Sequence, residues 1–204
     1  MLLLGEISCL IMLQKPSKNI VFFASGSGSN VENIINYFFG RQDVQFKGVL
    51  CNNPKAGVIE RCNRLGIPLY CFNKSAYNNP NGLLGLLDSL EPDLIVLAGF
   101  LWKIPEAFTS AFPDKIINIH PALLPKFGGK GMFGMHVHTA VVNAKERESG
   151  ITIHFVNDLY DDGKIIFQES VVVLPEDQPE DVAAKIHELE YRYFPEVIDR
   201  LLFT

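Results

Sequence analysis

The chain is poor in cysteine and has no close cysteine pair. Its 204 residues include four cysteines, and none of them forms a C-x-x-C motif. Three of the four stand in apolar stretches, which is typical of buried thiols in a reducing compartment. This pattern excludes a small disulfide-bonded scaffold, and it leads us to expect a cytoplasmic protein with buried thiols.

Charged residues are also scarce, and their balance is acidic. They make up 20% of the chain, against 48% hydrophobic residues, whereas an average soluble domain carries about 25% charged residues. Such a chain buries a large core and is not disordered. The 18 basic and 23 acidic side chains leave a net charge of −5, which is the wrong sign for a nucleic-acid surface. We expect no nucleic-acid partner, and an anionic ligand has to be held by local geometry.

The hydrophobic run at the start of the chain is too short to span a membrane. It covers residues 1–13, is interrupted by Glu6 and lacks a basic leading segment, whereas a spanning helix needs at least ~18 apolar residues. We expect neither a signal peptide nor a membrane partner. Since a domain typically holds about 150 residues, the sequence predicts a single domain over residues 19–204, preceded by a loose extension over residues 1–18.

From residue 19 onward, short apolar strands alternate with helices. This alternation predicts an α/β fold with an open, mostly parallel, doubly wound (Rossmann-like) sheet and helices on both faces. Ligands of such sheets bind beyond the carboxyl ends of the strands. The expected strands are residues 20–24, 44–51, 68–72, 93–98, 115–120, 151–156 and 164–173, and the expected helices are residues 31–39, 55–65, 83–90, 105–112, 137–145 and 179–203.

A glycine-serine loop joins the first expected strand to the first helix. The loop reads S-G-S-G-S-N at 25–30, and it directs free backbone N–H groups and the positive end of a helix dipole to one point, where a phosphate fits. Gly28 allows a close approach, while Ser29 and Asn30 cap the helix or donate to phosphate oxygens. Val31 stands where a dinucleotide fingerprint has its third glycine, and no Gly-Lys-Ser/Thr follows. An ordinary capped turn is the alternative interpretation.

Two polar residues stand at the end of a strand that is otherwise apolar. Asn118 and His120 are two positions apart in K-I-I-N-I-H-P, so both side chains lie on one face of the strand. If residues 151–156 form a neighbouring strand, Asp161 in the following D-L-Y-D-D-G turn approaches His120 and raises its pKa. A purely structural Asn–His pair is the alternative.

Such a trio suits attack on an acyl carbon by an external nucleophile. A protonated His120 polarises the carbonyl, Asn118 donates to the developing oxyanion and Asp161 stabilises the imidazolium. The chain has no G-x-S-x-G motif and no cysteine beside this trio, which favours direct transfer over a covalent intermediate. A zinc set that adds His136 and His138 is a weaker alternative, and we expect no metal.

Five motifs together are highly specific, and they cover the chain from about residue 19 to its end. They are S-G-S-G-S-N at 25–30, D-L-I-V-L-A-G-F at 93–100, I-N-I-H-P-A-L-L-P-K at 117–126, I-H-F-V-N-D at 153–158 and D-D-G at 161–163. On these motifs the chain closely resembles the glycinamide ribonucleotide formyltransferase family of purine biosynthesis. The resemblance implies direct transfer of a formyl group from 10-formyltetrahydrofolate, a co-substrate, to the amine of glycinamide ribonucleotide.

The resemblance also implies roles for individual residues. The catalytic trio of the family falls on Asn118, His120 and Asp161. The substrate-binding residues are Gly28, Ser29, Asn30 and Glu190, and the folate-binding residues are Leu101, Trp102, Lys103, Ile104 and Asn118. His187 lies one helical turn before Glu190, on the same face.

The chain departs from the family pattern at three places. We expect the irregular segment 121–135 to be functional or mobile, and the stretch after Pro125, residues 126–136, is several residues longer than its counterpart in the family. Asp162 adds a negative charge beside Asp161, and Trp102 stands where a basic residue is usual, which places the recognition of the glutamyl tail of folate in doubt.

Two other activities fit the same resemblance. The related formyltetrahydrofolate hydrolase and methionyl-tRNA formyltransferase share the N-I-H-P core, but they usually carry an extra domain at the amino or the carboxyl end, and we expect no such domain here. A phosphate-binding module of the same fold without catalysis is the alternative from a different class. Whether the protein is a monomer or a homodimer is left open.

Overall fold

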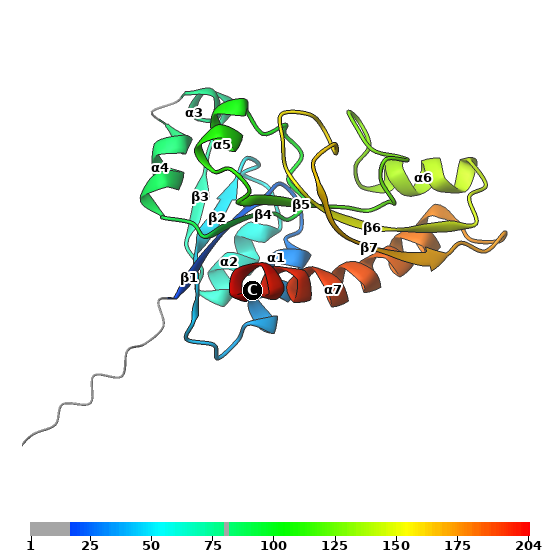
Figure 1. The fold of residues 1–204 in the computed structure, drawn as a ribbon, viewed down its shortest axis with the longest axis horizontal. Coiled ribbons are helices and arrows are strands. Elements are labelled where there is room, and N and C mark those ends of the chain that lie inside the picture. Colours follow the sequence, from blue (N-terminus) through cyan, green and yellow to red (C-terminus); the bar gives the residue numbers. More distant parts are fainter. Residues whose placement is uncertain (1–16, 80–81) are drawn as a thin grey trace, which may run out of the picture.

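The computed structural model describes residues 17–79 and 82–204, which build one seven-stranded sheet (Figure 1). The strand order is β3-β2-β1-β4-β5-β6-β7. The first five strands are parallel, whereas β6 runs antiparallel to both β5 and β7. The strands are β1 (Lys18–Ala24), β2 (Val44–Cys51), β3 (Leu69–Cys71), β4 (Leu94–Leu97), β5 (Ile116–His120), β6 (Glu148–Phe155) and β7 (Ile165–Val172).

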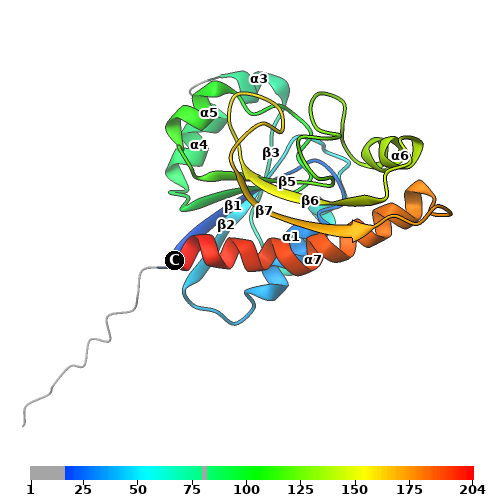
Figure 2. The ribbon, with the colours of Figure 1, turned by 45° about the vertical axis from the view of Figure 1, so that its right-hand side comes forward.

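Helices cover both faces of the sheet (Figure 2). Three short helices lie over one face, while α7 runs along the other with α1 and α2, and α6 packs against α7. The helices are α1 (Ser29–Tyr37), α2 (Val58–Leu65), α3 (Lys74–Asn78), α4 (Leu83–Ser89), α5 (Glu106–Ala111), α6 (Met135–Asn143) and α7 (Pro179–Phe203).

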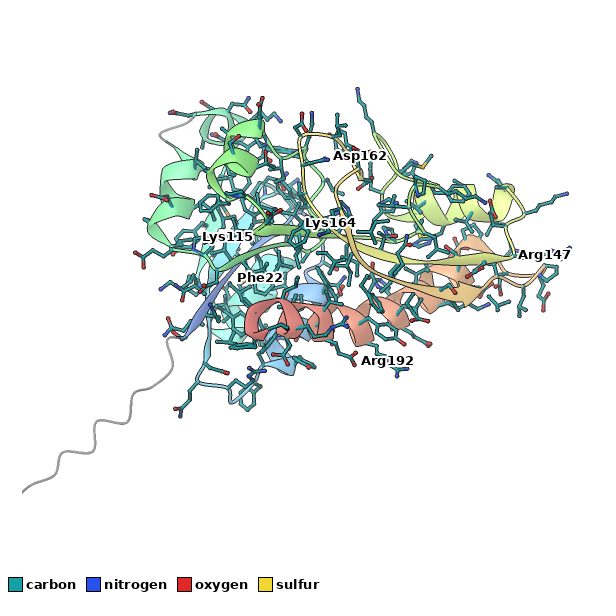
Figure 3. The ribbon with its side chains drawn as sticks, viewed as in Figure 1. Phe22, Lys115, Arg147, Asp162, Lys164 and Arg192 are labelled. Atoms are coloured by element: carbon teal, nitrogen blue, oxygen red, sulfur yellow. The ribbon has the colours of Figure 1, made fainter. Side chains whose placement is uncertain are left out.

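The alternation of side chains along β1 divides the core into two halves. Phe22 points into the half beneath α1, α2 and α7 (Figure 3), where its ring stacks on Phe46 at 5.7 Å between centroids. Phe23, the next residue, points the other way and meets Phe100 edge-on at 5.1 Å. Both side chains are fully buried. Because each face of β1 is covered, the strand reads as a continuous apolar run, as the central strand of a parallel sheet does.

The fold class predicted from the sequence is confirmed, with corrections of detail. Lys18 is the first residue of β1 and pairs with Asp93, so it does not belong to an extension. The remainder of that expected extension lies, except for Ser17, outside the described residues. The helix expected over residues 55–65 begins at Val58, and the short helix α3 was not predicted. The antiparallel pairs of the sheet are β5 with β6 and β6 with β7, so β6 is the strand that runs against the others.

The expectation of buried thiols holds for two cysteines and is wrong for a third. Cys51 and Cys62 are buried, whereas Cys71 on the short strand β3 is exposed, and all three are free. Cys9 lies outside the described residues. Among the helices of the described residues, none is long and apolar enough to cross a membrane.

The order of the strands predicts where a ligand binds. Connections from β1 go first to one side of the sheet, through β2 and β3, and then to the other side, through β4 and β5. The loops that follow β1 and β4 therefore diverge, which opens a crevice beyond the carboxyl ends of these strands. The motif at 25–30, the A-G-F motif and the Asn118–His120 pair all stand at this edge.

Candidate active site

A cavity of about 600 Å³ opens at the carboxyl ends of β1, β4 and β5. Its walls are the loop after β1, the loop after β4, the end of β5, the segment from Gly129 to Met135 and the inner face of α7. A smaller cavity of about 70 Å³ lies beside it, between the segment after β4 and the loop after β6. Five residues line both cavities and form the wall between them: Phe100, Leu101, Asn118, Tyr160 and Asp161. Asn118 and Asp161 are the two of them that also carry the predicted chemistry.

His120 is held at the end of β5 in one tautomer. Its side chain is 3% exposed, and Nε2 lies 2.8 Å from the carbonyl oxygen of Phe127. Because a carbonyl oxygen can only accept, Nε2 carries the proton. The other ring nitrogen, Nδ1, faces Oδ2 of Asp161 at 3.5 Å. The sequence prediction that Asp161 approaches His120 is therefore confirmed.

Asp161 owes its position to a tight turn after β6. The residue has a left-handed backbone conformation, with φ of 51°, and its Oδ2 accepts a hydrogen bond of 2.8 Å from the backbone N–H of Gly129. Two residues later, Gly163 packs so closely on the carbonyl group of Phe155 that a Cβ atom has no room. The D-D-G turn thus needs its glycine. Asp162 is exposed, lines neither cavity and accepts a hydrogen bond of 3.5 Å from Asn157.

His154 joins this group, although the sequence analysis did not assign it a role. It pairs with Asn118 across the antiparallel strands β5 and β6. Its Nδ1 donates to the carbonyl oxygen of Phe155 at 2.8 Å, so Nε2 accepts a hydrogen bond of 3.2 Å from Nδ2 of Asn118. The same Nε2 lies 3.8 Å from Oδ1 of Asp161. His154 therefore orients Asn118. The sequence analysis missed this role because it depends on which residues of β5 and β6 face each other, and no local sequence pattern shows this pairing.

Burial decides the charge of His120. Removal from water lowers the pKa of its imidazole, and the neighbouring Asp161 and the carbonyl of Phe127 raise this pKa by less. The sequence prediction of a raised pKa is thus wrong in its net sign, although Asp161 acts in the expected direction. For Asp161, burial raises the pKa, but His154, His120 and the N–H of Gly129 together lower it below its usual range. At neutral pH a carboxylate faces a neutral imidazole.

The loop at 25–30 forms one end of the larger cavity. Gly28 precedes α1 with φ of 78°, and a Cβ atom there would meet Val58, including its Cα at 2.9 Å. The first helical hydrogen bond runs from the N–H of Glu32 to the carbonyl of Gly28, so the amides of Ser29 and Asn30 precede the helical hydrogen-bond ladder and point along the dipole. Arg61 fixes the outside of the loop by donating to the carbonyl of Ser27 at 2.8 Å. This geometry suits a phosphate.

Glu190 reaches the same end of the cavity from α7. It is 7% exposed, and its Oε2 accepts one hydrogen bond from Asn30 Nδ2 at 3.0 Å and a second from His187 Nδ1 at 2.9 Å. The side chain of Asn30 is thus used for Glu190, which leaves its backbone N–H for a ligand. Asn30 Oδ1 and His138 Nδ1 are buried without a hydrogen-bond partner in the described residues. Both residues line the larger cavity.

The five residues expected to bind folate all line the smaller cavity, and one of them is Asn118 of β5. Leu101, Trp102, Lys103 and Ile104 follow β4 there, and the carbonyl of Lys103 accepts a hydrogen bond of 2.9 Å from the hydroxyl of Tyr77. The ring of Trp102 lies edge-on to that of Tyr77. Lys74 of α3 places its Nζ 4.4 Å from the Trp102 ring. A positive charge therefore stands beside Trp102, the position at which a basic residue is usual in the family.

The zinc alternative finds no support in the geometry. Among residues 17–79 and 82–204, no three His, Cys, Asp or Glu side chains are grouped closely enough to hold a metal ion. His136 is exposed, whereas His138 is buried.

Comparison with known proteins agrees with this geometry. The sequence profile described as formyl transferase matches residues 18–198. The phosphoribosylglycinamide formyltransferase of Bacillus subtilis is 35% identical over 190 residues, which cover 91% of this chain and 95% of that protein. The crystal structure of the Bacillus halodurans phosphoribosylglycinamide formyltransferase superposes with a TM-score of 0.82 at 32% identity, over 92% of this chain and 96% of the other.

A plant relative is longer. The chloroplastic phosphoribosylglycinamide formyltransferase of Arabidopsis thaliana is 39% identical over 89% of this chain, but the match covers 64% of the plant protein. The chain thus spans less than two thirds of the plant relative, and nearly all of the bacterial one. The family profile and the bacterial relative both extend over most of this chain, and so the chain belongs to the formyl transferase family.

Proposed function

We propose that this protein transfers the formyl group of 10-formyltetrahydrofolate directly to the amine of glycinamide ribonucleotide. The observation that carries the proposal is the common wall of the two cavities, where Asn118 and Asp161 stand beside His120. A phosphate loop closes one cavity, and apolar and aromatic residues after β4 line the other. The two substrates of the reaction therefore meet at the polar trio.

In the proposed reaction the phosphate of the ribonucleotide lies on the amides of Ser29 and Asn30. Its amine then points along the larger cavity toward β5. One end of the folate lies at the smaller cavity, against Leu101, Trp102, Lys103 and Ile104, and the folate presents its formyl group at the common wall. It is consumed in each turnover and is a substrate, not a resident cofactor.

The chemical step forms a bond between the amine nitrogen and the formyl carbon. The carbonyl oxygen gains negative charge, which the side-chain amide of Asn118 stabilises by a hydrogen bond. The bond between the formyl carbon and the folate nitrogen then breaks. One proton leaves the amine, and one proton reaches the departing nitrogen.

His120 and Asp161 divide the work of this proton transfer. Because burial keeps His120 neutral, the imidazole is able to accept the proton of the amine and return it to the folate nitrogen. The carboxylate of Asp161 faces Nδ1 and stabilises the imidazolium that exists between these two events. Ser27 and Ser29 line the larger cavity, but both belong to the loop that is proposed to bind the phosphate. Neither therefore serves as a covalent nucleophile, and the amine attacks the formyl carbon directly.

The test is an assay of formyl transfer with purified protein. With both substrates present, the formyl group leaves the folate; with the ribonucleotide omitted, it stays. Equal loss without the acceptor contradicts a transferase and indicates the hydrolase. No loss from a folded protein contradicts catalysis and favours the phosphate-binding module.

Three finer expectations stay predictions. The cytoplasmic location rests on the sequence, and the plant relatives carry the word chloroplastic in their names. The absence of a metal requirement and the choice between monomer and homodimer also remain to be measured.

A further inference from the structure

Three thiols lie on one face of the sheet, at the side that carries β2 and β3. Cys51 ends β2, Cys71 ends β3, and the register of the two parallel strands sets these residues opposite each other. Leu69 of β3 packs on the core half beneath α1, α2 and α7, whereas Tyr70 packs on the other half. Cys71 therefore shares the face of Leu69, and Cys51 and Cys62 belong to the same half of the core.

The geometry suits a bond between Cys51 and Cys71. Neighbouring strands lie about 4.8 Å apart, and a disulfide spans a Cα separation of about 4.4 to 6.8 Å. Among the described strands, β3 stands at the edge and pairs with β2 alone, and it is three residues long. A short edge strand is held on one side only, so it is able to make the small movement that bond formation needs.

Exposure separates the roles of the two thiols. Cys71 is exposed, whereas Cys51 is fully buried. Burial raises the pKa of the Cys51 thiol more than its hydrogen bond to the carbonyl of Asn53 lowers it, and Cys71 raises it further. The thiolate, not the thiol, is the reactive nucleophile. An oxidant in solution therefore reaches Cys71 first, and Cys51 stands behind it as the second thiol.

Cys51 also begins the segment that positions the glycine-serine loop at 25–30. Its Sγ donates to the carbonyl of Asn53 at 3.3 Å, and Nδ2 of Asn53 donates to the carbonyl of Ser25 at 3.2 Å. Further along, the N–H of Val58 donates to the carbonyl of Gly26 at 3.1 Å. A disulfide at Cys51 removes the proton of Sγ and draws the end of β2 toward β3. Both changes act on the residues that hold this loop.

We propose that Cys51 and Cys71 are a reversible redox pair, which hydrogen peroxide converts to a disulfide and which thereby weakens binding at the loop 25–30. The effect on the ribonucleotide rests on the proposed function, whereas formation of the disulfide does not. In a reducing compartment a disulfide of this kind is transient. The pair therefore links the state of the loop to the oxidation of an exposed thiol.

The oxidation takes place in two steps. The sulfur of Cys71 attacks the peroxide, the O–O bond breaks, and Cys71 becomes a sulfenic acid while one water leaves. The sulfur of Cys51 then attacks the sulfur of Cys71, so that an S–S bond forms and the S–O bond breaks. The proton of Cys51 leaves with the hydroxide as a second water. Two thiols are thus oxidised and one peroxide is reduced, and a dithiol reductant reverses the change by exchange.

Peptide mapping of the full chain tests the disulfide. The protein is treated with hydrogen peroxide, its free thiols are blocked with N-ethylmaleimide, and it is digested with trypsin. Cys51, Cys62 and Cys71 then fall in separate peptides, residues 48–55, 62–64 and 65–74. We expect 48–55 to be joined to 65–74, and dithiothreitol to separate them. Absence of this link, or a link from 65–74 to any other peptide or to a second copy of itself, refutes the pair.

Hydrogen exchange and kinetics test the effect on the loop, with Cys71→Ser under the same peroxide treatment as the matched control. Cys71 is exposed, so the variant keeps the fold but is unable to form the bond. In the oxidised wild type we expect faster exchange of the amides at 25–30 and a KM for glycinamide ribonucleotide about tenfold higher, the scale of a lost hydrogen bond. The treated control shows neither change, and dithiothreitol restores the wild type.

The two readouts distinguish the two proposals. Linked peptides with unchanged exchange at 25–30, or with an unchanged KM in an active protein, refute the control of the loop. Linked peptides and faster exchange in a protein that transfers no formyl group support the redox pair and refute the proposed function.

Discussion

Asp161→Asn is the substitution that tests the proposed proton transfer most sharply. The asparagine has nearly the same shape, so it retains the position after β6 while it removes the negative charge. In the wild type this charge faces His120 Nδ1 at 3.5 Å and His154 Nε2 at 3.8 Å. The variant therefore loses the group that stabilises an imidazolium at His120, and little else.

The magnitude follows from the environment of the carboxylate. Its side chain is 12% exposed, so solvent screens it only weakly, and removal of one preorganised electrostatic contact in such a site costs about 10²- to 10³-fold in kcat. The charge of Asp161 also raises the pKa of His120. Without it, the pKa of His120 falls further, and the acidic limb of the kcat/KM profile moves to lower pH.

The assay is steady-state formyl transfer over a range of pH, with Asp162→Asn as the matched control. Asp162 is the adjacent residue, carries the same charge, is exposed and accepts a hydrogen bond of 3.5 Å from Asn157. We expect this control to stay within about twofold of the wild type, since exposed surface substitutions have small effects. Near-normal turnover of a folded Asp161→Asn, shown to be folded by its urea unfolding curve, would refute the mechanism.

Three further substitutions probe the rest of the site. Gly28→Ala places a methyl group against Val58 at a left-handed position, so we expect the KM for the ribonucleotide to rise at least tenfold, and an unchanged KM contradicts the phosphate loop. Trp102→Ala is expected to raise the KM for the folate and not that for the ribonucleotide; equal changes in both contradict the smaller cavity as the folate site. Burial lowers the pKa of His138 in the folded protein, whereas in the unfolded chain this imidazole titrates near its ordinary pKa of about 6.5. As the pH falls below about 6.5, the unfolded chain therefore binds a proton before the folded chain does, and the free energy of unfolding falls. His138→Gln should therefore lose less free energy of unfolding between pH 7.5 and pH 5.5 than the wild type in urea titrations, and an equal loss contradicts this.

Much of the fold follows from local signals in the sequence. Phe22 and Phe23 are adjacent apolar residues in a short run, which is possible only where both faces of a strand are covered, so β1 was predictable as a central strand. The segment of α3 was harder, because a helix of five residues has no apolar period to detect. Its Tyr77 is instead fixed by tertiary contacts, above all the hydrogen bond to the carbonyl of Lys103.

The site was predictable where one strand or one loop supplies it. Asn118 and His120 share a face because of the period of a strand, and the glycine-serine loop at 25–30, the proposed phosphate site, stands directly before a helix. His154 depends on the antiparallel register of β6 against β5, which no local pattern encodes. The net pKa of His120 depends on its burial, and burial is a property of the whole fold.

The most direct test of the central claim is to follow the formyl carbon itself. Purified protein is supplied with 10-formyltetrahydrofolate labelled with ¹³C in the formyl group, together with one equivalent of glycinamide ribonucleotide, and the reaction is observed by NMR. We expect the label to appear in the formylated amide, with one amide formed for each folate consumed. Appearance of the label as formate, or its retention on the folate in the presence of the acceptor, would contradict the account.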